Sequence, residues 1–588
     1  MATIKKKIQS FSTKGANQTF TTQPANTLRD FFVILAVLLC GSTWAAERVT
    51  VTIFDAPYDV ILEENNKLIP QADRDSTAVH YQGRLADYED SWVRLSSIGG
   101  QWQGVVSFAG TTYLVGADSA ISSENVLPGS KQQAEFSQNP TIKARQLASF
   151  PAQTCGHKDH LHSSNLEKQS ATLSPTAHSA TVLPEQVAFG TLCDSSNIIN
   201  GVCLLAELEM AFDQEFQQSF SDPQGQALAL INIVEGFYRN DFNIAFDTLT
   251  LEMLTNDILS PAVINSDGEL VTTASPDILE DLSAKRLSGQ LNFLQNNRSL
   301  FHFVTGREIE GTTAGIAFTG TLCDDFAIGV SELLFNIPLT AVVVAHELGH
   351  NFGSGHDGEG AGASCPSSGF IMAPSISSGF DEFSNCSINQ IQSHISSINI
   401  PQLCFNFPAD LSITASANNQ DTAEANQTFI LEYQINRVSG FEAIPSLQVT
   451  GSILTTEGQI NSATLNGLDC PVTGSSYSCS FLNPLPQMVL EIQAQGNSGT
   501  ASFTHQVSTN NANIVDTNTS NNQIQTELTI TAATTPPPPT TPPSPGTTSG
   551  SSGGGGGSIG WPLLSLLALM AWLRHRYSLI EKSYEITL

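Results

Sequence analysis

The segment that most constrains this 588-residue chain reads HELGHNFGSGHD and occupies residues 346–357. An apolar run leads into it, so we expect a helix in which His346 and His350 lie on one face and share a metal ion. Gly353 can adopt a positive φ at no steric cost, which lets the chain turn back and present His356 as a third ligand. Three protein ligands leave one position of a zinc ion open for water, as in catalytic rather than structural zinc sites.

Two more residues give this segment a catalytic character. Glu347 follows the first histidine and points beside the metal, where it can act as general base on a bound water. A bare His-Glu-x-x-His pattern occurs by chance on many amphipathic helices, but the glycine, third histidine and aspartate at fixed offsets argue against coincidence. Met372, in the run FIMAP, would ordinarily be core filler, but after this motif it predicts a methionine turn beneath the metal.

The pattern extends in both directions from the motif. Downstream it includes Asp357, Ile371 and the run 383–387, and upstream it includes Cys323 and the segments 305–317 and 206–216. With these features, residues 47–405 resemble the adamalysin (reprolysin, ADAM-type) family of metzincin zinc metalloproteases. The resemblance implies an α/β catalytic domain with a mixed sheet and a zinc helix, in which substrate peptide binds as an added strand at the sheet edge.

The order of apolar runs also indicates a mixed α/β sheet without reference to the resemblance. Strand-like runs at 206–211 and 246–253 alternate with runs of helical periodicity at 226–237 and 278–294. We therefore expect the catalytic domain to occupy residues 184–406.

Members of the family that this chain resembles often carry a structural calcium ion far from the zinc. Glu207 matches one expected calcium ligand. Ser299 stands where the family usually has an aspartate, and Asn406 is offset from the expected asparagine. The sequence therefore predicts one zinc ion per chain and argues against calcium.

The cysteines indicate an oxidising compartment. The chain has ten, and setting aside Cys40 in the N-terminal apolar run leaves nine, an odd number. Two pairs are close enough in sequence to close small loops, and the resemblance implies two more: Cys193–Cys203 and Cys470–Cys479, then Cys323–Cys404 and Cys365–Cys386. Cys155 is left over, either as a stray thiol or as a residue with chemistry of its own.

Cys155 follows a segment that resembles the adamalysin-type prodomain at residues 80–84, 91–96 and 104–113. Alternating apolar residues there predict a small β-rich domain, and we expect residues 47–183 to form the prodomain. A thiolate is a good zinc ligand, so Cys155 in the fourth zinc position would exclude water and keep the enzyme latent, as a cysteine switch. No dibasic run lies between Cys155 and Cys193, and the polar stretch 157–183 is the expected place of an activating cut.

Residues 1–46 have the pattern of a secretory signal peptide. Basic residues precede the apolar run 31–39, which is too short to span a bilayer and is followed by small residues. Cys40 raises the alternative of a lipoprotein, but Leu39 before it is bulky where a small residue is preferred. Export to the outside of the cell is therefore expected.

Charge excludes some partners. The net charge is −31, from 55 acidic and 24 basic residues that are spread along the chain. This balance argues against nucleic acid or anionic membrane as partners and suits a soluble extracellular protein.

The pattern of short strands and turns in residues 407–532 predicts an immunoglobulin-like β-sandwich. Short alternating strands at 411–415, 428–433 and 523–528 are separated by turns rich in Asn, Gly and Asp. Residues 516–522 resemble the closing hairpin of bacterial CARDB-type adhesion modules. The sandwich is either a rigid spacer or a binding module, and the disintegrin-like cysteine-rich region of animal ADAM proteins does not follow it.

The C-terminal part predicts a sorting signal. Residues 533–558 are rich in Pro and Thr and then in Gly, which is typical of a solvated linker. The following apolar run is short for a stable span, and the basic residues after it would stay cytoplasmic. Residues 559–588 resemble the GlyGly-CTERM tail of Gram-negative bacteria, which implies transient anchoring in the inner membrane and cutting by a rhombosortase-type protease. An ordinary transmembrane anchor is the alternative.

Taken together, the sequence predicts a secreted bacterial zinc endopeptidase that is made as a latent precursor and acts on protein or peptide substrates. His346, His350 and His356 would hold the zinc, and Glu347 would act as base. A surface adhesion protein with an idle metzincin domain is the alternative from another class, which the intact Glu347 disfavours. A zinc hydrolase of non-peptide amides is a third hypothesis.

Overall fold

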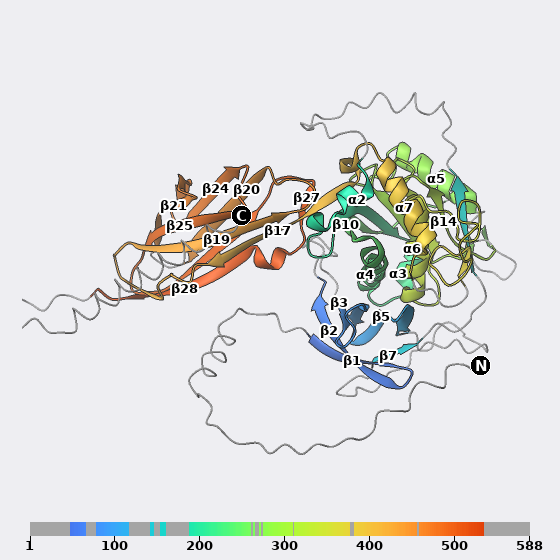
Figure 1. The fold of residues 1–588 in the computed structure, drawn as a ribbon, viewed down its shortest axis with the longest axis horizontal. Coiled ribbons are helices and arrows are strands. Elements are labelled where there is room, and N and C mark those ends of the chain that lie inside the picture. Colours follow the sequence, from blue (N-terminus) through green and yellow to red (C-terminus); the bar gives the residue numbers. More distant parts are fainter. Residues whose placement is uncertain are drawn as a thin grey trace, which may run out of the picture. The chain divides into compact units, whose positions relative to one another are not determined.

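The computed structural model describes residues 47–65, 78–116, 142–145, 153–159, 187–259, 263–264, 270–271, 275–309, 311–376, 382–454 and 458–533. The predicted signal peptide, most of the linker and the C-terminal tail lie outside these residues. Within them, no helix is long and apolar enough to cross a membrane. The described chain contains an N-terminal barrel, a mixed α/β sheet with its helices, and a C-terminal β-rich region (Figure 1).

The N-terminal region is β-rich, as the sequence indicates, and its strands close into a barrel. Neighbouring strands are antiparallel, and the barrel closes through a parallel pairing of the first strand with the last. The strands are β1 (Glu47–Ile53), β2 (Ala56–Glu64), β3 (Val79–Leu85), β4 (Trp92–Ile98), β5 (Gln101–Phe108), β6 (Thr111–Val115) and β7 (Ile142–Arg145). Apolar side chains that alternate along these strands fill the interior and give the barrel a core of its own.

The sheet that follows is mixed, as the alternating runs predict. Its strand order is β16-β8-β14-β15-β13-β9, and β10 pairs with β9. The strands are β8 (Gln153–Asp159), β9 (Leu204–Phe212), β10 (Ile244–Met253), β13 (Leu300–Thr305), β14 (Thr313–Thr319), β15 (Ile328–Glu332) and β16 (Ser375–Ile376). β14 runs antiparallel to β15, while β10, β9, β13 and β15 are mutually parallel. A separate small pair joins β11 (Val263–Ile264) and β12 (Leu270–Val271).

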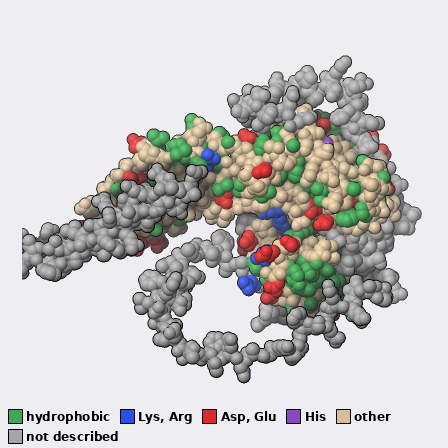
Figure 2. All heavy atoms as spheres, in the orientation of Figure 1, with side chains coloured by type: hydrophobic (Ala, Val, Ile, Leu, Met, Phe, Trp, Pro, Cys, Tyr) green, Lys and Arg blue, Asp and Glu red, His purple; other side chains and the backbone are tan. Residues whose placement is uncertain are grey.

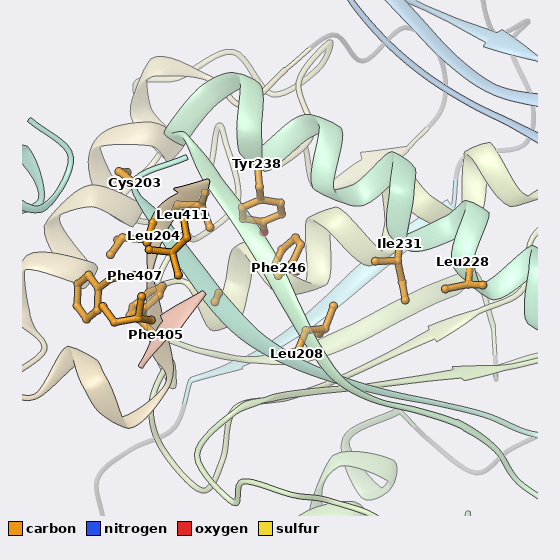
Figure 3. Packing of buried hydrophobic residues seen from close by; sticks show 14 of the residues in the cluster. Cys203, Leu204, Leu208, Leu228, Ile231, Tyr238, Phe246, Phe405, Phe407 and Leu411 are labelled. Atoms are coloured by element: carbon orange, nitrogen blue, oxygen red, sulfur yellow. The ribbon is translucent and has the colours of Figure 1, made fainter. Parts of the chain in front are cut away.

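Helices cover both faces of this sheet. One face packs against α4 (Pro223–Phe242) and α6 (Ile337–Asn351), and the other packs against α5 (Ser275–Leu287). Side chains from α4, β9, β10 and β17 (Phe405–Ala415) meet in the apolar cluster of Figure 3. The shorter helices are α2 (Phe189–Leu192), α3 (Gln214–Gln218) and η4 (Ser195–Asn197), and α7 (Asn385–Ser397) and η5 (Pro401–Leu403) follow the motif.

The C-terminal region consists of two groups of strands. β17 pairs with β9 at Phe405 and Asn406, and further along it pairs with β19 and β27. It therefore joins the mixed α/β sheet to the first group of C-terminal strands. The strands that continue from it are β19 (Phe429–Ser439), β25 (Gln487–Gln495), β21 (Gln459–Leu465), β22 (Leu468–Asp469) and β27 (Ile514–Asp516). The second sheet contains β18 (Thr422–Glu424), β28 (Gln523–Thr531), β26 (Gly499–Ser508), β20 (Ser446–Leu454), β24 (Ser476–Leu482) and β23 (Val472–Thr473), and η6 (Thr519–Asn521) precedes β28.

The described residues contain four disulfides, and they are the four pairs expected: Cys193–Cys203, Cys323–Cys404, Cys365–Cys386 and Cys470–Cys479. Cys155 is free and buried. On the face drawn in Figure 2 the surface is mostly uncharged, with acidic side chains scattered over it.

Candidate metal centre

The helix α6 presents the first two histidines because its sequence fixes both its ends. The Asn336 side chain accepts a hydrogen bond from the Leu339 amide at 2.9 Å, which caps the first turn, and Pro338 occupies an early helical position where its missing N–H is harmless. All fifteen residues of the helix are buried. The Tyr238 hydroxyl of α4 donates to the Ala345 carbonyl at 3.0 Å and anchors the turn that contains His346.

The three histidines of the motif converge on one point. The Nε2 atoms of His346 and His350 are 3.1 Å apart, and each is 3.2 Å from the Nε2 of His356. Ligand nitrogens around a tetrahedral zinc with bonds of about 2.0–2.1 Å would lie roughly 3.3 Å apart, so the triad fits this ion.

The opposite ring nitrogens fix the tautomer. His346 Nδ1 lies 2.6 Å from the Ile371 carbonyl, His350 Nδ1 lies 2.8 Å from the Ser354 carbonyl, and both are donors to these oxygens. His356 Nδ1 lies 3.2 Å from Glu359 Oε2. Each Nε2 is therefore left with its lone pair towards the centre. No pattern in the sequence distinguished Glu359, because its role depends on the turn after the third histidine.

The chain leaves the helix as the motif predicts. Gly353 has φ +97°, and a Cβ on it would lie 2.5 Å from the Cβ of His394 in α7. Both the left-handed backbone and the close approach require glycine at this position.

Met372 lies beneath the helix, in the expected turn. A Cβ on Gly349 would lie 2.5 Å from the Met372 sulfur, so the methionine packs against the helix between the two histidine ligands. Asp357 donates its amide proton to the Met372 carbonyl at 2.8 Å. The Asp357 carboxylate accepts hydrogen bonds from Ser384 at 2.6 Å and Ser387 at 2.9 Å, which ties the third ligand's loop to α7.

Glu347 is completely buried beside the triad. A Glu347 oxygen, a His346 ring nitrogen and the Cys155 sulfur all lie within 4.8 Å of one another. Burial raises the pKa of Glu347 well above its usual range, and it also raises the pKa of the Cys155 thiol, with the Glu347 charge adding to that increase. A bound divalent cation would reverse both effects, because it favours the ionised thiol and carboxylate.

Cys155 reaches this position because β8 is part of the catalytic sheet, which the sequence did not predict. β8 pairs in parallel with β14, with Cys155 opposite Gly315, and it pairs antiparallel with β16. It therefore occupies the edge of β14 that lies opposite β15. A Cβ on Gly315 would lie 2.6 Å from Glu347 Oε1, so glycine permits this close approach of strand and carboxylate.

A groove of about 780 Å³ opens beside the third histidine. Its lining comes from the end of β14, the loop after α6 and one side of α7: Thr319, Gly353, Gly355, His356, Glu359, Gly360, Ala361, Asn389, Gln390, Ser393, His394 and Ser397.

The residues considered for calcium make hydrogen bonds to protein groups instead. Asn406 Nδ2 donates to Asp247 at 2.7 Å and to Glu207 at 3.3 Å, and the Asn296 amide also donates to Glu207. Ser299 donates to Glu209 at 2.8 Å. In this arrangement the amide N–H groups of Asn296 and Asn406 point at the carboxylates that the sequence considered as cation ligands.

Comparison with known proteins defines the class of this domain. Residues 206–384 match the model of Reprolysin_5, described as metallo-peptidase family M12. The zinc metalloproteinase-disintegrin-like proteins brevilysin H2a and H2b of Gloydius brevicauda are each 30% identical to this chain over 189 residues, which is 32% of this chain and 42% of theirs. The chain therefore spans less than half the length of these relatives. Its central part, residues 206–384, is therefore similar to the metallopeptidase domains of family M12.

Solved structures also align with parts of the chain. Metalloproteinase-II from Bacteroides fragilis aligns with 11% identity and a TM-score of 0.29, covering 62% of this chain and 95% of that chain. The CARDB domain of the PF1109 protein from Pyrococcus furiosus aligns with 17% identity and a TM-score of 0.14, covering 21% and 94%. Similarities this low carry no argument about fold or function.

Proposed function

We propose that this protein is a secreted, zinc-dependent endopeptidase that is made as a latent precursor and hydrolyses peptide bonds of extracellular proteins. The observation that carries the proposal is the convergence of three histidine Nε2 atoms beside a buried glutamate, within an M12 metallopeptidase domain. His346, His350 and His356 would hold the zinc. Zinc bound there supplies a Lewis acid that polarises the substrate carbonyl and acidifies water.

Residues of this chain would bind the substrate and transfer the proton. Substrate would pair with the edge of β14, with side chains near the scissile bond reaching the groove beside His356. Glu347 would take a proton from the attacking water and later give it to the leaving amine. Because its site is buried, Glu347 acts in a medium where charge interactions are strong.

Latency would come from β8 and Cys155. β8 occupies the edge on which substrate would pair, and the Cys155 sulfur lies within 4.8 Å of a His346 ring nitrogen and a Glu347 oxygen. A thiolate on the zinc would exclude the water. Removal of residues 47–183 by a cut in the polar stretch before Val187 would then open both the edge and the metal.

Secretion and processing complete the proposal. The four disulfides suit an oxidising compartment outside the cytosol. Residues 1–46 would direct export from a Gram-negative cell, and the tail 559–588 would hold the chain at the inner membrane until a rhombosortase-type protease cuts it.

A peptide-library experiment tests the proposed activity. The purified, activated protein should cleave peptides in a mixed library, lose activity with a chelator and regain it with zinc. Glu347→Gln should keep the zinc but lose about 10²- to 10⁴-fold in rate, the usual contribution of a general base. Full zinc occupancy without cleavage of any peptide would overturn the endopeptidase, and wild-type rates in Glu347→Gln would remove Glu347 from its role.

A further inference from the structure

The helix α4 carries polar residues where a core helix would be apolar. Its side that faces the sheet is lined by Leu228, Ile231 and Tyr238 (Figure 3). On another side, Asn232 is fully buried and Glu235 is 4% exposed. Buried polar groups need partners, and most of the partners here belong to the N-terminal barrel.

Asn232 uses both ends of its amide on the barrel. Its Nδ2 donates to the carbonyls of Tyr81 at 3.1 Å and Leu95 at 3.3 Å, which lie on adjacent strands β3 and β4. Its Oδ1 accepts from Asn65 Nδ2 at 3.0 Å. One helix side chain therefore binds three separate strands or strand ends of the barrel.

Glu235 forms a buried ion pair with the barrel. Arg94 of β4 lies 3.3 Å from its carboxylate, and both side chains are 5% exposed. Arg239, one turn further along α4, lies 3.9 Å from the same oxygen. Gln82 of β3 accepts hydrogen bonds from Arg94 at 3.1 Å and from Arg239 at 2.9 Å, which closes the network.

Gly236 lets the barrel approach the helix backbone. A Cβ on it would lie 2.6 Å from Cζ3 of Trp92 and 2.7 Å from Cγ of Arg94. Its nearest neighbours are both barrel residues, so nothing in the catalytic domain accounts for glycine at this helical position. Trp92 also packs edge-to-face on Phe237, with ring centroids 5.1 Å apart.

We propose that this face of α4 (Asn232, Glu235, Gly236 and Phe237) is a docking site for the chain's own barrel, residues 47–145, which holds the barrel on the catalytic domain independently of Cys155. The polar side chains of this α4 face are typical of an interface whose two sides can separate. Asn232 and Glu235 can be solvated when the barrel leaves, and Glu235 keeps Arg239 as a partner on its own helix. The barrel is closed and has its own core, so it can leave as a unit without an open sheet edge.

One consequence concerns activation and rests on the proposed function. A cut after β8 would leave the barrel bound non-covalently, and the inhibitory strand would stay with it. Activation would then need the barrel to dissociate or to be degraded, in addition to the cut. The docking itself can be tested without any enzymatic activity.

The experiment detaches the barrel from β8 within the full precursor. A recognition sequence for a site-specific protease is inserted after Ala148, between β7 and β8, and the chain is cut there. Cys155 and β8 then remain with the catalytic fragment, so the barrel fragment can be retained only through its contacts with helices α4 and α6, and substitutions on the α4 face measure the share of that face. Size-exclusion chromatography measures whether the two fragments elute together.

The expected result is co-elution of the wild-type fragments and at least tenfold faster dissociation in Gly236→Leu and in Arg94→Met. Gly236 lies in the catalytic fragment and Arg94 lies in the barrel. A folding defect in one fragment therefore leaves the dissociation rate measured with the other variant interpretable. Gly190→Leu is the matched control, because a Cβ there meets no atom within 4 Å. Immediate separation of the wild-type fragments, or unchanged retention in both variants, would overturn the docking site and would leave the proposed protease untouched.

Discussion

The contact between Gly315 and Glu347 yields the sharpest prediction on catalysis. A Cβ on Gly315 would lie 2.6 Å from Oε1, 2.8 Å from Cγ and 2.9 Å from Cδ of Glu347. Gly315 lacks a left-handed φ, so alanine is compatible with its backbone. β14 is held by β15 along this stretch, so the carboxylate rather than the strand must move in Gly315→Ala.

The size of the effect follows from the displacement. Ordinary contacts begin at about 3.5 Å, so the Glu347 side chain must shift by roughly 1 Å. A misplacement of about 1 Å at a reacting group costs about 100-fold in rate. This corresponds to about 2.7 kcal/mol in activation free energy. The three atoms nearest to the new methyl group all belong to Glu347 and none belongs to a histidine, so zinc should remain bound.

The assay is kcat/KM on a fluorogenic peptide, with zinc content measured on the same activated sample. Gly190→Ala is the control, because its Cβ meets nothing within 4 Å. A zinc-replete Gly315→Ala enzyme within threefold of the wild type would refute the reasoning about Glu347. Loss of zinc in the variant would show instead that the methyl group displaces the histidine triad.

Three further predictions follow from other parts of the chain. Cys155→Ser in the precursor should raise basal peptidase activity by about tenfold or more, since serine is a far poorer zinc ligand than a thiolate; ready alkylation of Cys155 in the zinc-loaded precursor would contradict this. Burial raises the pKa of the Glu332 carboxyl from 4.5 to about 7, so the folded state loses stability as pH rises through that window. Glu332→Gln should therefore raise the free energy of unfolding at pH 8 by about 1–2 kcal/mol and leave it unchanged at pH 4, as urea titrations at the two pH values would show. Protein recovered from the medium should end before Trp561 by intact mass, and chains that still contain residues 561–576 would mean a permanent anchor.

The convergence of the three histidines could be predicted because it depends on local sequence. Two histidines four residues apart on an apolar helix need no long-range contact to share a face, and Gly353 supplies the turn that returns the third. The same holds for β9 and α4, whose apolar periodicity matches the runs seen in the sequence.

Two features that depend on contacts between distant segments were not predicted: the place of β8 in the sheet and the docking of the barrel on α4. β8 pairs with β14, which lies more than 150 residues further along the chain. The sequence suggested a role for Cys155 but did not indicate that its strand belongs to the sheet. Asn232 and Glu235 look like exposed positions of an amphipathic helix until the barrel covers them. Pairing of remote strands and docking of modules leave no periodic signal, because the partner is far away in the chain.

The nested disulfides around the motif link the stability of the site to the place where the protein folds. Cys323 and Cys404 close a segment of 81 residues that contains all three histidines and Met372, and Cys365 and Cys386 close a loop of 21 residues inside it. Closing a loop of the larger size lowers the entropy of the unfolded chain by the equivalent of roughly 4–5 kcal/mol. A precursor that remained among reduced thiols would lack this contribution and would hold its histidines in a loose segment. The disulfides would thus favour an ordered arrangement of the three histidines only in molecules that have reached an oxidising compartment. The producing cell would then be protected before inhibition by β8 is needed.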